Sequence, residues 1–200
     1  EGMQGAINLA NELAHEIPNS FQFNQFENPS NPKIHANTTA KEIWNQSNQN
    51  IDGLVTGIGT GGTVTGCGDF LKKVNPKCKI YGVEPKKSAV ISGGKAGSHA
   101  IQGIGAGFIP KVLNTEVIDE IIQVDDKEAF YYGRLLARME GLLSGISSGA
   151  ALAATIQIGQ RKEFINKRLI VILPSYGERY LSTPMFDTNS SILARDDGFL

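Results

Sequence analysis

The stretch "DGLVTGIGTGGTVTGCGDFLKK", residues 52–73, joins a run of apolar residues to a helical pattern through a cluster of glycines. An apolar segment without alternation is typical of a strand that is covered on both faces of a parallel sheet. The periodicity after the glycines predicts a helix over roughly 64–74. Because glycines let backbone N–H groups approach an anion closely at a helix start, this unit predicts a phosphate site.

Further strands and helices alternate on both sides of this unit. We expect strands over 21–26, 79–84, 117–124 and 168–174, and helices over 1–17, through Ile34, Thr38 and Trp44, over 127–140 and over 150–160. This order predicts an α/β fold with a mainly parallel sheet flanked by helices. Residues 92–110 are rich in glycine and lack periodicity, so we expect a long mobile loop there.

Size and charge narrow the possible partners. The chain has 200 residues, 40% of them hydrophobic and 20% charged, with a net charge of −1. These values fit a globular domain and point to neither nucleic acid nor a membrane as a partner. Cys67 and Cys78 fit neither a metal spacing nor a disulfide framework, so a cytoplasmic location is expected. The chain opens at Glu1 inside a helical pattern, and we expect it to be a fragment of a longer protein.

The glycine cluster also matches a second cofactor motif. Gly57, Gly59 and Gly62 spell G-x-G-x-x-G, and Glu84 ends the next predicted strand, as in dinucleotide-binding proteins. However, the core "GTGGT", Gly59–Thr63, carries two threonine hydroxyls, which suit a terminal phosphate monoester better than a bridging pyrophosphate. The motif alone leaves both cofactors and a ligand-free turn open.

A third motif, "GISSG" at 145–149, matches the nucleophile elbow G-x-S-x-G. In that fold the catalytic histidine follows the serine, whereas His15, His35 and His99 all precede Ser147. The serine-hydrolase interpretation is therefore rejected. The histidines also lack ligand-like spacing with cysteine or carboxylate, so no metal site is expected.

Six segments in order carry a family resemblance: "QFENPSNPKIH" (25–35), "GIGTGGTVTG" (57–66), "YGVEP" (81–85), "IQGIGAGFIP" (101–110), "EGLLSGISSGAA" (140–151) and "PSYGERYLST" (174–183). Together they closely resemble the cysteine synthase, or O-acetylserine (thiol) lyase, family of β-family, fold-type II pyridoxal-phosphate enzymes, over about residues 1–186. The resemblance implies a fold like that of the tryptophan synthase β-subunit. Residues 1–30 would end a smaller N-terminal domain, and 31–200 would form the large cofactor-binding domain, with a polar tail from about 187.

The resemblance also implies roles for particular residues. Gly59, Thr60, Gly61, Gly62 and Thr63 match the family's cup for the 5′-phosphate of pyridoxal phosphate, and Ser147 matches the serine that hydrogen-bonds the pyridine nitrogen. Gln25 matches a glutamine that binds the substrate carboxylate, and Gly103 a glycine on the loop bordering the substrate. The catalytic lysine that forms the Schiff base lies upstream of Glu1 in the family. We therefore expect the 200-residue chain alone to lack a catalytic residue and to be inactive.

The implied reaction is β-replacement on O-acetylserine with sulfide, which gives cysteine and acetate in cysteine biosynthesis. Two alternatives share these motifs: a β-cyanoalanine synthase, and a non-catalytic relative that binds the C-terminal peptide of a partner. The resemblance implies a homodimer. Docking of serine acetyltransferase is doubtful, because Ala100 stands where the family usually has a lysine.

Overall fold

A computed structural model describes residues 2–186 and contains one four-stranded sheet. The strands are β1 (Gly53–Gly57), β2 (Lys79–Pro85), β3 (Glu120–Val124) and β4 (Leu169–Val171). Their order is β3-β2-β1-β4, and every neighbouring pair is parallel, with Leu54 opposite both Ile80 and Ile170. The predicted α/β fold is confirmed.

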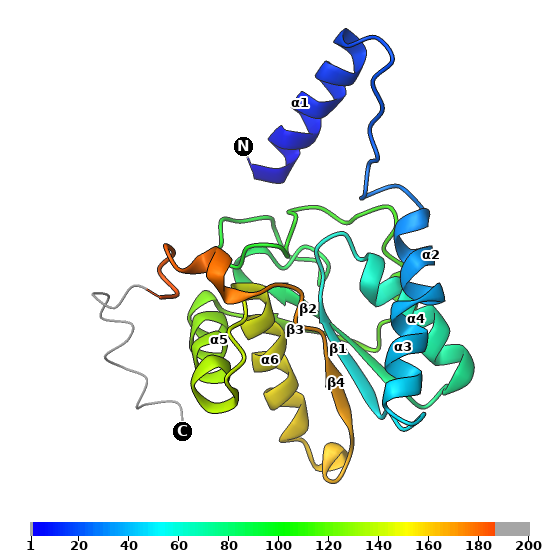
Figure 1. Ribbon diagram of the computed structural model, residues 1–200, viewed down its shortest axis with the longest axis vertical. Helices are drawn as coiled ribbons and strands as arrows, with labels where there is room; N and C mark the ends of the chain where they lie inside the picture. The colour runs from blue at the N-terminus through cyan, green and yellow to red at the C-terminus, as the bar shows by residue number, and fades with distance from the viewer. Residues whose placement is uncertain (1, 187–200) are drawn as a thin grey trace.

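Helices cover both faces of this sheet (Figure 1). On one face lie α5 (Asp126–Glu140) and α6 (Ile146–Gly159); on the other lie α2 (Ser30–Asn37), α3 (Thr39–Gln46) and α4 (Gly62–Val74). Alternate side chains of β1 enter different cores: Leu54 packs with Val64 and Leu71 of α4, whereas Val55 packs with residues of α6. Burial on both faces explains why β1 has no polar alternation.

Several local predictions are confirmed at the ends of helices. Asp125 and Glu128 form a capping box at the start of α5, and Gly141 closes that helix with a φ of 68°. The predicted first helix exists as α1 (Gly2–Glu16). None of its residues is buried, and it stands apart from the sheet and its covering helices (Figure 1).

Two predictions upstream of β1 are wrong in detail. Residues 21–26 form no strand, because no neighbouring strand pairs with them; Phe21 and Phe23 instead contact each other edge to face and are 78% and 77% exposed. The single helix expected through Thr38 is two helices, since Thr38 leaves the helical region with φ −122° and ψ −78°. Its hydroxyl donates to the carbonyl of Ile34 at 2.8 Å and so helps to end α2.

Downstream, two boundaries also shift. The strand expected over 117–124 starts only at Glu120, after a short 3-10 turn at Thr115–Val117. Helix α6 starts at Ile146, not at residue 150, so Ser147 lies in its first turn. The segment 92–110 has neither helix nor strand, as expected. No helix of residues 2–186 has the length and apolar character that crossing a membrane requires. The predicted tail from about 187 lies outside the described residues.

Candidate functional site

The glycine-rich segment forms a cup at the carboxyl edge of the sheet, between the end of β1 and the start of α4. Gly61 caps α4 in the left-handed conformation, with a φ of 84°. Among residues 2–186, no acceptor is found for the N–H groups of Gly59, Thr60 and Gly61. These N–H groups, together with the positive end of the α4 dipole, make the cup suitable for an anion with several oxygens.

Close packing explains two of the glycines in the cup. A Cβ on Gly59 would lie 2.5 Å from the carbonyl oxygen of Gly103. A Cβ on Gly62 would collide with the side-chain oxygen of Asn31. A side chain at either position would therefore displace the segment that faces it.

Ser147 and Gly103 lie beside the cup, although they are distant from it in sequence. The Oγ of Ser147 is 3.6 Å from the position that a Cβ on Gly103 would take, and Gly105 N–H donates to the carbonyl of Ile58 at 3.0 Å. Ser147 is only 3% exposed, and its hydroxyl has no hydrogen-bond partner within the described residues. The loop at 103–105 thus joins the cup to the first turn of α6, next to the Ser147 hydroxyl.

Gln25 is close to the cup only through its backbone. Its carbonyl accepts a hydrogen bond from Asn31 Nδ2 at 2.9 Å, and the same amide donates to Thr60 Oγ1 at 2.9 Å. The Gln25 residue is exposed. The structure therefore brings the predicted residues Gly59–Thr63, Gly103 and Ser147 together, with Gln25 at their margin.

Two residues of α2 belong to this site and were not identified from the sequence. Asn31 contacts Thr60 and Gly62, and His35 Nε2 lies 3.4 Å from Thr63 Oγ1. Their spacing of four residues places both on one face of a helix, which is the signal that could have marked them. Burial lowers the pKa of His35 below its ordinary value, so the imidazole is neutral at neutral pH.

Glu84, the acid of the dinucleotide motif, is used inside the fold. Its carboxylate is 1% exposed and accepts hydrogen bonds from the N–H groups of Ile91 at 2.9 Å and Ser92 at 3.1 Å. A dinucleotide site needs this carboxylate for the ribose hydroxyls. Since it already holds the turn after β2, the geometry disfavours a dinucleotide.

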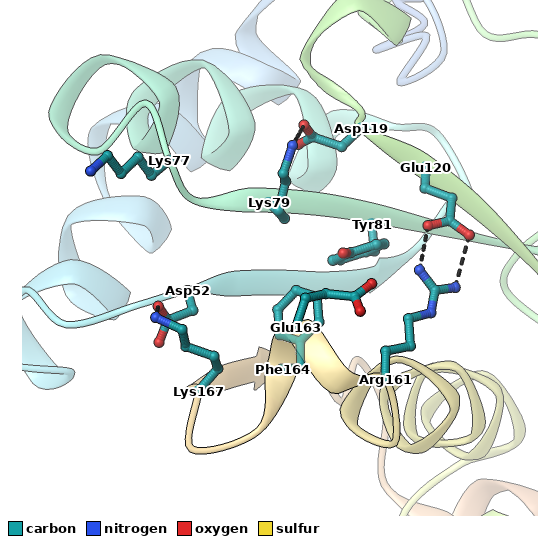
Figure 2. Close-up of a pocket in the computed structure, with 10 residues that line it drawn as sticks. All are labelled: Asp52, Lys77, Lys79, Tyr81, Asp119, Glu120, Arg161, Glu163, Phe164 and Lys167. Atoms are coloured by element: carbon teal, nitrogen blue, oxygen red, sulfur yellow. Dashed lines mark hydrogen bonds and ion pairs between the residues drawn. The ribbon is translucent and has the colours of Figure 1, made fainter.

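A hollow of about 390 Å³ lies at the opposite, amino edge of the sheet (Figure 2). Its charged side chains largely neutralise one another: Arg161 pairs with both oxygens of Glu120 at 2.6 and 2.8 Å, Lys79 with Asp119 at 3.0 Å, and Lys167 with Asp52 at 3.1 Å. The bonds from Arg161 lower the pKa of Glu120. These pairs tie the starts of the strands to the connection between α6 and β4, which favours a structural role for this edge. Across residues 2–186, no group of three or more histidine, cysteine or carboxylate side chains could hold a metal ion.

Comparison with known proteins agrees with the chemistry of the cup. Residues 1–175 match the family described as "Pyridoxal-phosphate dependent enzyme". The chain is 50% identical to a cysteine synthase of Buchnera aphidicola subsp. Acyrthosiphon pisum (strain APS), over 92% of this chain and 62% of that protein. It is 49% identical to a cysteine synthase of Staphylococcus aureus (strain Mu50 / ATCC 700699), over 93% of this chain and 60% of that protein.

Solved structures give the same result. The cysteine synthase (OASS) of Entamoeba histolytica superposes with a TM-score of 0.89 at 41% identity, covering 98% of this chain and 59% of that one. An O-ureido-L-serine synthase superposes with a TM-score of 0.87 at 39% identity, covering 93% and 58%. The chain thus spans about 60% of the length of the relatives that it matches.

Proposed function

The chain belongs to the family of pyridoxal-phosphate dependent enzymes, and from this premise we propose that the protein catalyses β-replacement on O-acetylserine with sulfide. The products are cysteine and acetate. Identities of about 50% to proteins named cysteine synthase support this reaction. The single structural observation that carries the proposal is the convergence of Gly59, Gly103 and Ser147 at the carboxyl edge of the sheet.

The residues present fit pyridoxal 5′-phosphate. The free N–H groups and the two threonine hydroxyls between Gly59 and Thr63 would hold its phosphate, which only accepts hydrogen bonds when fully ionised. The hydroxyl of Ser147, which has no hydrogen-bond partner within residues 2–186, would donate to the pyridine nitrogen. When bound, the cofactor withdraws electrons from Cα of an amino acid and so weakens the bonds around that carbon.

Ser147 favours replacement over transamination. Its hydroxyl is neutral, so it does not hold the ring nitrogen protonated as a carboxylate would. It also lies in the first turn of α6, where the positive end of the helix dipole disfavours a cation. The resulting weaker electron withdrawal is sufficient when a good β-leaving group departs directly after the Cα proton.

The substrate would lie next to the loop that carries Gly103. Three of its glycines, Gly103, Gly105 and Gly107, have positive φ values, which other residues adopt rarely, so this loop has a backbone that only glycine supports easily. The amide of Gln25 would donate to the substrate carboxylate without adding a net charge. The catalytic lysine is not assigned to any position of this chain.

The remaining parts of the proposal concern organisation. We assign residues 1–30 to a smaller domain, because α1 buries none of its residues against the body of the fold, and residues 31–200 to the cofactor-binding domain. A homodimer in the cytoplasm is proposed; two buried free cysteines support a reducing compartment. Docking of serine acetyltransferase is not proposed, since Ala100 supplies no charge and its N–H is bonded to Asp126 at 3.0 Å.

The test compares two reactions in the complete protein. We expect turnover of O-acetylserine with sulfide to exceed turnover of cysteine with cyanide. The reverse preference would assign a β-cyanoalanine synthase instead. Tight cofactor binding without turnover of either pair would support a non-catalytic relative, and no binding of pyridoxal phosphate would overturn the proposal.

A further inference from the structure

We propose that Asn31 and His35 of α2 are positioning residues, which turn the hydroxyl protons of Thr60 and Thr63 toward the anion in the cup. This inference rests on the proposed function, because it assumes that the cup holds a phosphate. It concerns the direction of hydrogen bonds around two hydroxyls rather than the identity of the cup.

The orientation of the Asn31 amide follows from its partners. The carbonyl of Gln25 can only accept, so the atom of Asn31 that faces it at 2.9 Å must be the donor Nδ2. The same nitrogen lies 2.9 Å from Thr60 Oγ1 and donates its second proton there. The amide is thus held in one orientation by a backbone carbonyl.

Thr60 is thereby left with a single role. Its oxygen also receives the N–H of Gly62 at 3.3 Å, so two donors occupy the two acceptor positions of the hydroxyl. The one remaining proton has no acceptor within the described residues. A hydroxyl in this state can only donate, and a phosphate dianion supplies the acceptor oxygens that it requires.

His35 sets up the same arrangement at Thr63. Its Nδ1 lies 2.9 Å from Thr39 Oγ1, and its Nε2 lies 3.4 Å from Thr63 Oγ1. A neutral imidazole has one N–H and one lone pair. With the proton on Nε2, the ring accepts from Thr39 and donates to Thr63, so the proton of Thr63 is free for the anion. An anion in the cup favours this tautomer over the other.

Donors fixed in this way discriminate between ligands. A phosphate monoester dianion accepts every hydrogen bond that the cup offers, whereas the hydroxymethyl group of pyridoxal offers one oxygen that can also donate. The contribution of Asn31 and His35 should therefore be large for pyridoxal 5′-phosphate and inorganic phosphate. It should be small for pyridoxal.

The experiment measures binding to the complete protein, freed of cofactor, by equilibrium dialysis against these three ligands. Asn31→Leu keeps the approximate size of the side chain and removes both donated protons without adding a charge that would itself repel a phosphate. We expect this variant to bind pyridoxal 5′-phosphate and inorganic phosphate about tenfold or more weakly than the original protein does. Binding of pyridoxal should change by less than about twofold.

The matched control is Asn37→Leu, which makes the same substitution on an exposed position of the same helix. It should leave all three affinities within about twofold of the original protein. Two variants of His35 distinguish the loss of a hydrogen-bond donor from the loss of packing. His35→Leu removes the donor, whereas the glutamine amide of His35→Gln can donate to Thr63. His35→Gln should therefore keep most of the phosphate affinity that His35→Leu loses.

The outcomes separate this inference from the proposed function. An original protein that binds no pyridoxal 5′-phosphate overturns the function. An original protein that binds it, with an Asn31→Leu variant of unchanged affinity, overturns the positioning role alone. Equal weakening of the binding of pyridoxal and of its phosphate in both the Asn31→Leu and His35→Leu variants would likewise overturn it, since that pattern indicates general damage to the site.

Discussion

The carbonyl oxygen of Gly103 lies 2.5 Å from the point at which a Cβ on Gly59 would stand. Forty-odd residues of chain separate these two glycines, yet their backbones touch without a side chain between them. The contact closes one side of the cup and sets the position of the loop next to Ser147. It also makes Gly59 the position at which the smallest substitution should have the largest effect.

Gly59→Ala should therefore damage both the cup and the loop. The added methyl group pushes the Gly103 carbonyl away, so we expect a stability loss of about 1–3 kcal/mol and cofactor binding weakened by about tenfold or more. Gly159→Ala is the matched control, because a Cβ there meets only the Leu169 side chain at an ordinary 3.8 Å. Urea unfolding and pyridoxal phosphate titration measure the two effects. Equal behaviour of both variants would contradict the contact.

Ser147→Asp should change the reaction rather than abolish binding. A carboxylate would favour a protonated ring nitrogen, so β-replacement should fall and transamination should rise relative to it. The neighbouring Ser148 provides the control: its hydroxyl donates to the carbonyl of Ser175 at 3.2 Å, so Ser148→Ala should cost about 1 kcal/mol of stability without altering the product ratio. Product analysis with O-acetylserine measures this, and an unchanged ratio in Ser147→Asp would exclude its role at the ring.

Local signals in the sequence were sufficient for most of the fold. The glycine cluster after an unbroken apolar run predicted the β1–α4 unit, and the Asp125–Glu128 pair and Gly141 marked both ends of α5 correctly. By contrast, the aromatic residues at 21, 23 and 26 resembled those of a strand, and only the absence of a neighbouring strand shows that the segment is not one. Pairing is a long-range property that local composition alone does not determine.

The candidate site could likewise be predicted only where its residues are neighbours in the sequence. The cup could be predicted because all of its residues are consecutive in the sequence. The contact between Gly103 and Ser147 follows from the packing of a long irregular loop against α6, which no local pattern encodes. Asn31 and His35 were missed because α2 is short and polar, so no apolar periodicity marks its first turn or the face that meets the cup. The roles of residues 59–63, Gly103, Gln25 and Ser147 and the boundary near residue 30 stay predictions.

Both cysteines should resist thiol reagents in the folded protein. Burial raises the pKa of Cys67 to about 12 and that of Cys78 to about 11, and both side chains are fully buried. Since the thiolate is the reactive form, we expect negligible labelling at about pH 8 until guanidinium unfolds the chain, after which both thiols react. Time courses with Ellman's reagent test this. Rapid labelling of a native thiol would show that one of these two positions opens to solvent.

His35 should make the protein less stable in acid. Burial lowers the pKa of His35 below 6.5 in the folded state. At pH values between this lowered pKa and 6.5, the unfolded chain therefore binds more protons than the folded one. Protonation therefore favours unfolding, and the stability that the neutral ring maintains above 6.5 is lost as the pH falls through this window. His35→Gln removes the titration, so the loss of stability between about pH 7.5 and pH 5.5 should be smaller in this variant than in the original protein. Acidic groups such as Asp52, whose folded pKa is lowered, contribute equally to both proteins and cancel in the difference. Urea unfolding of both proteins at the two pH values measures this difference. Equal losses of stability in the two proteins would mean that His35 has the same pKa in the folded and unfolded chains.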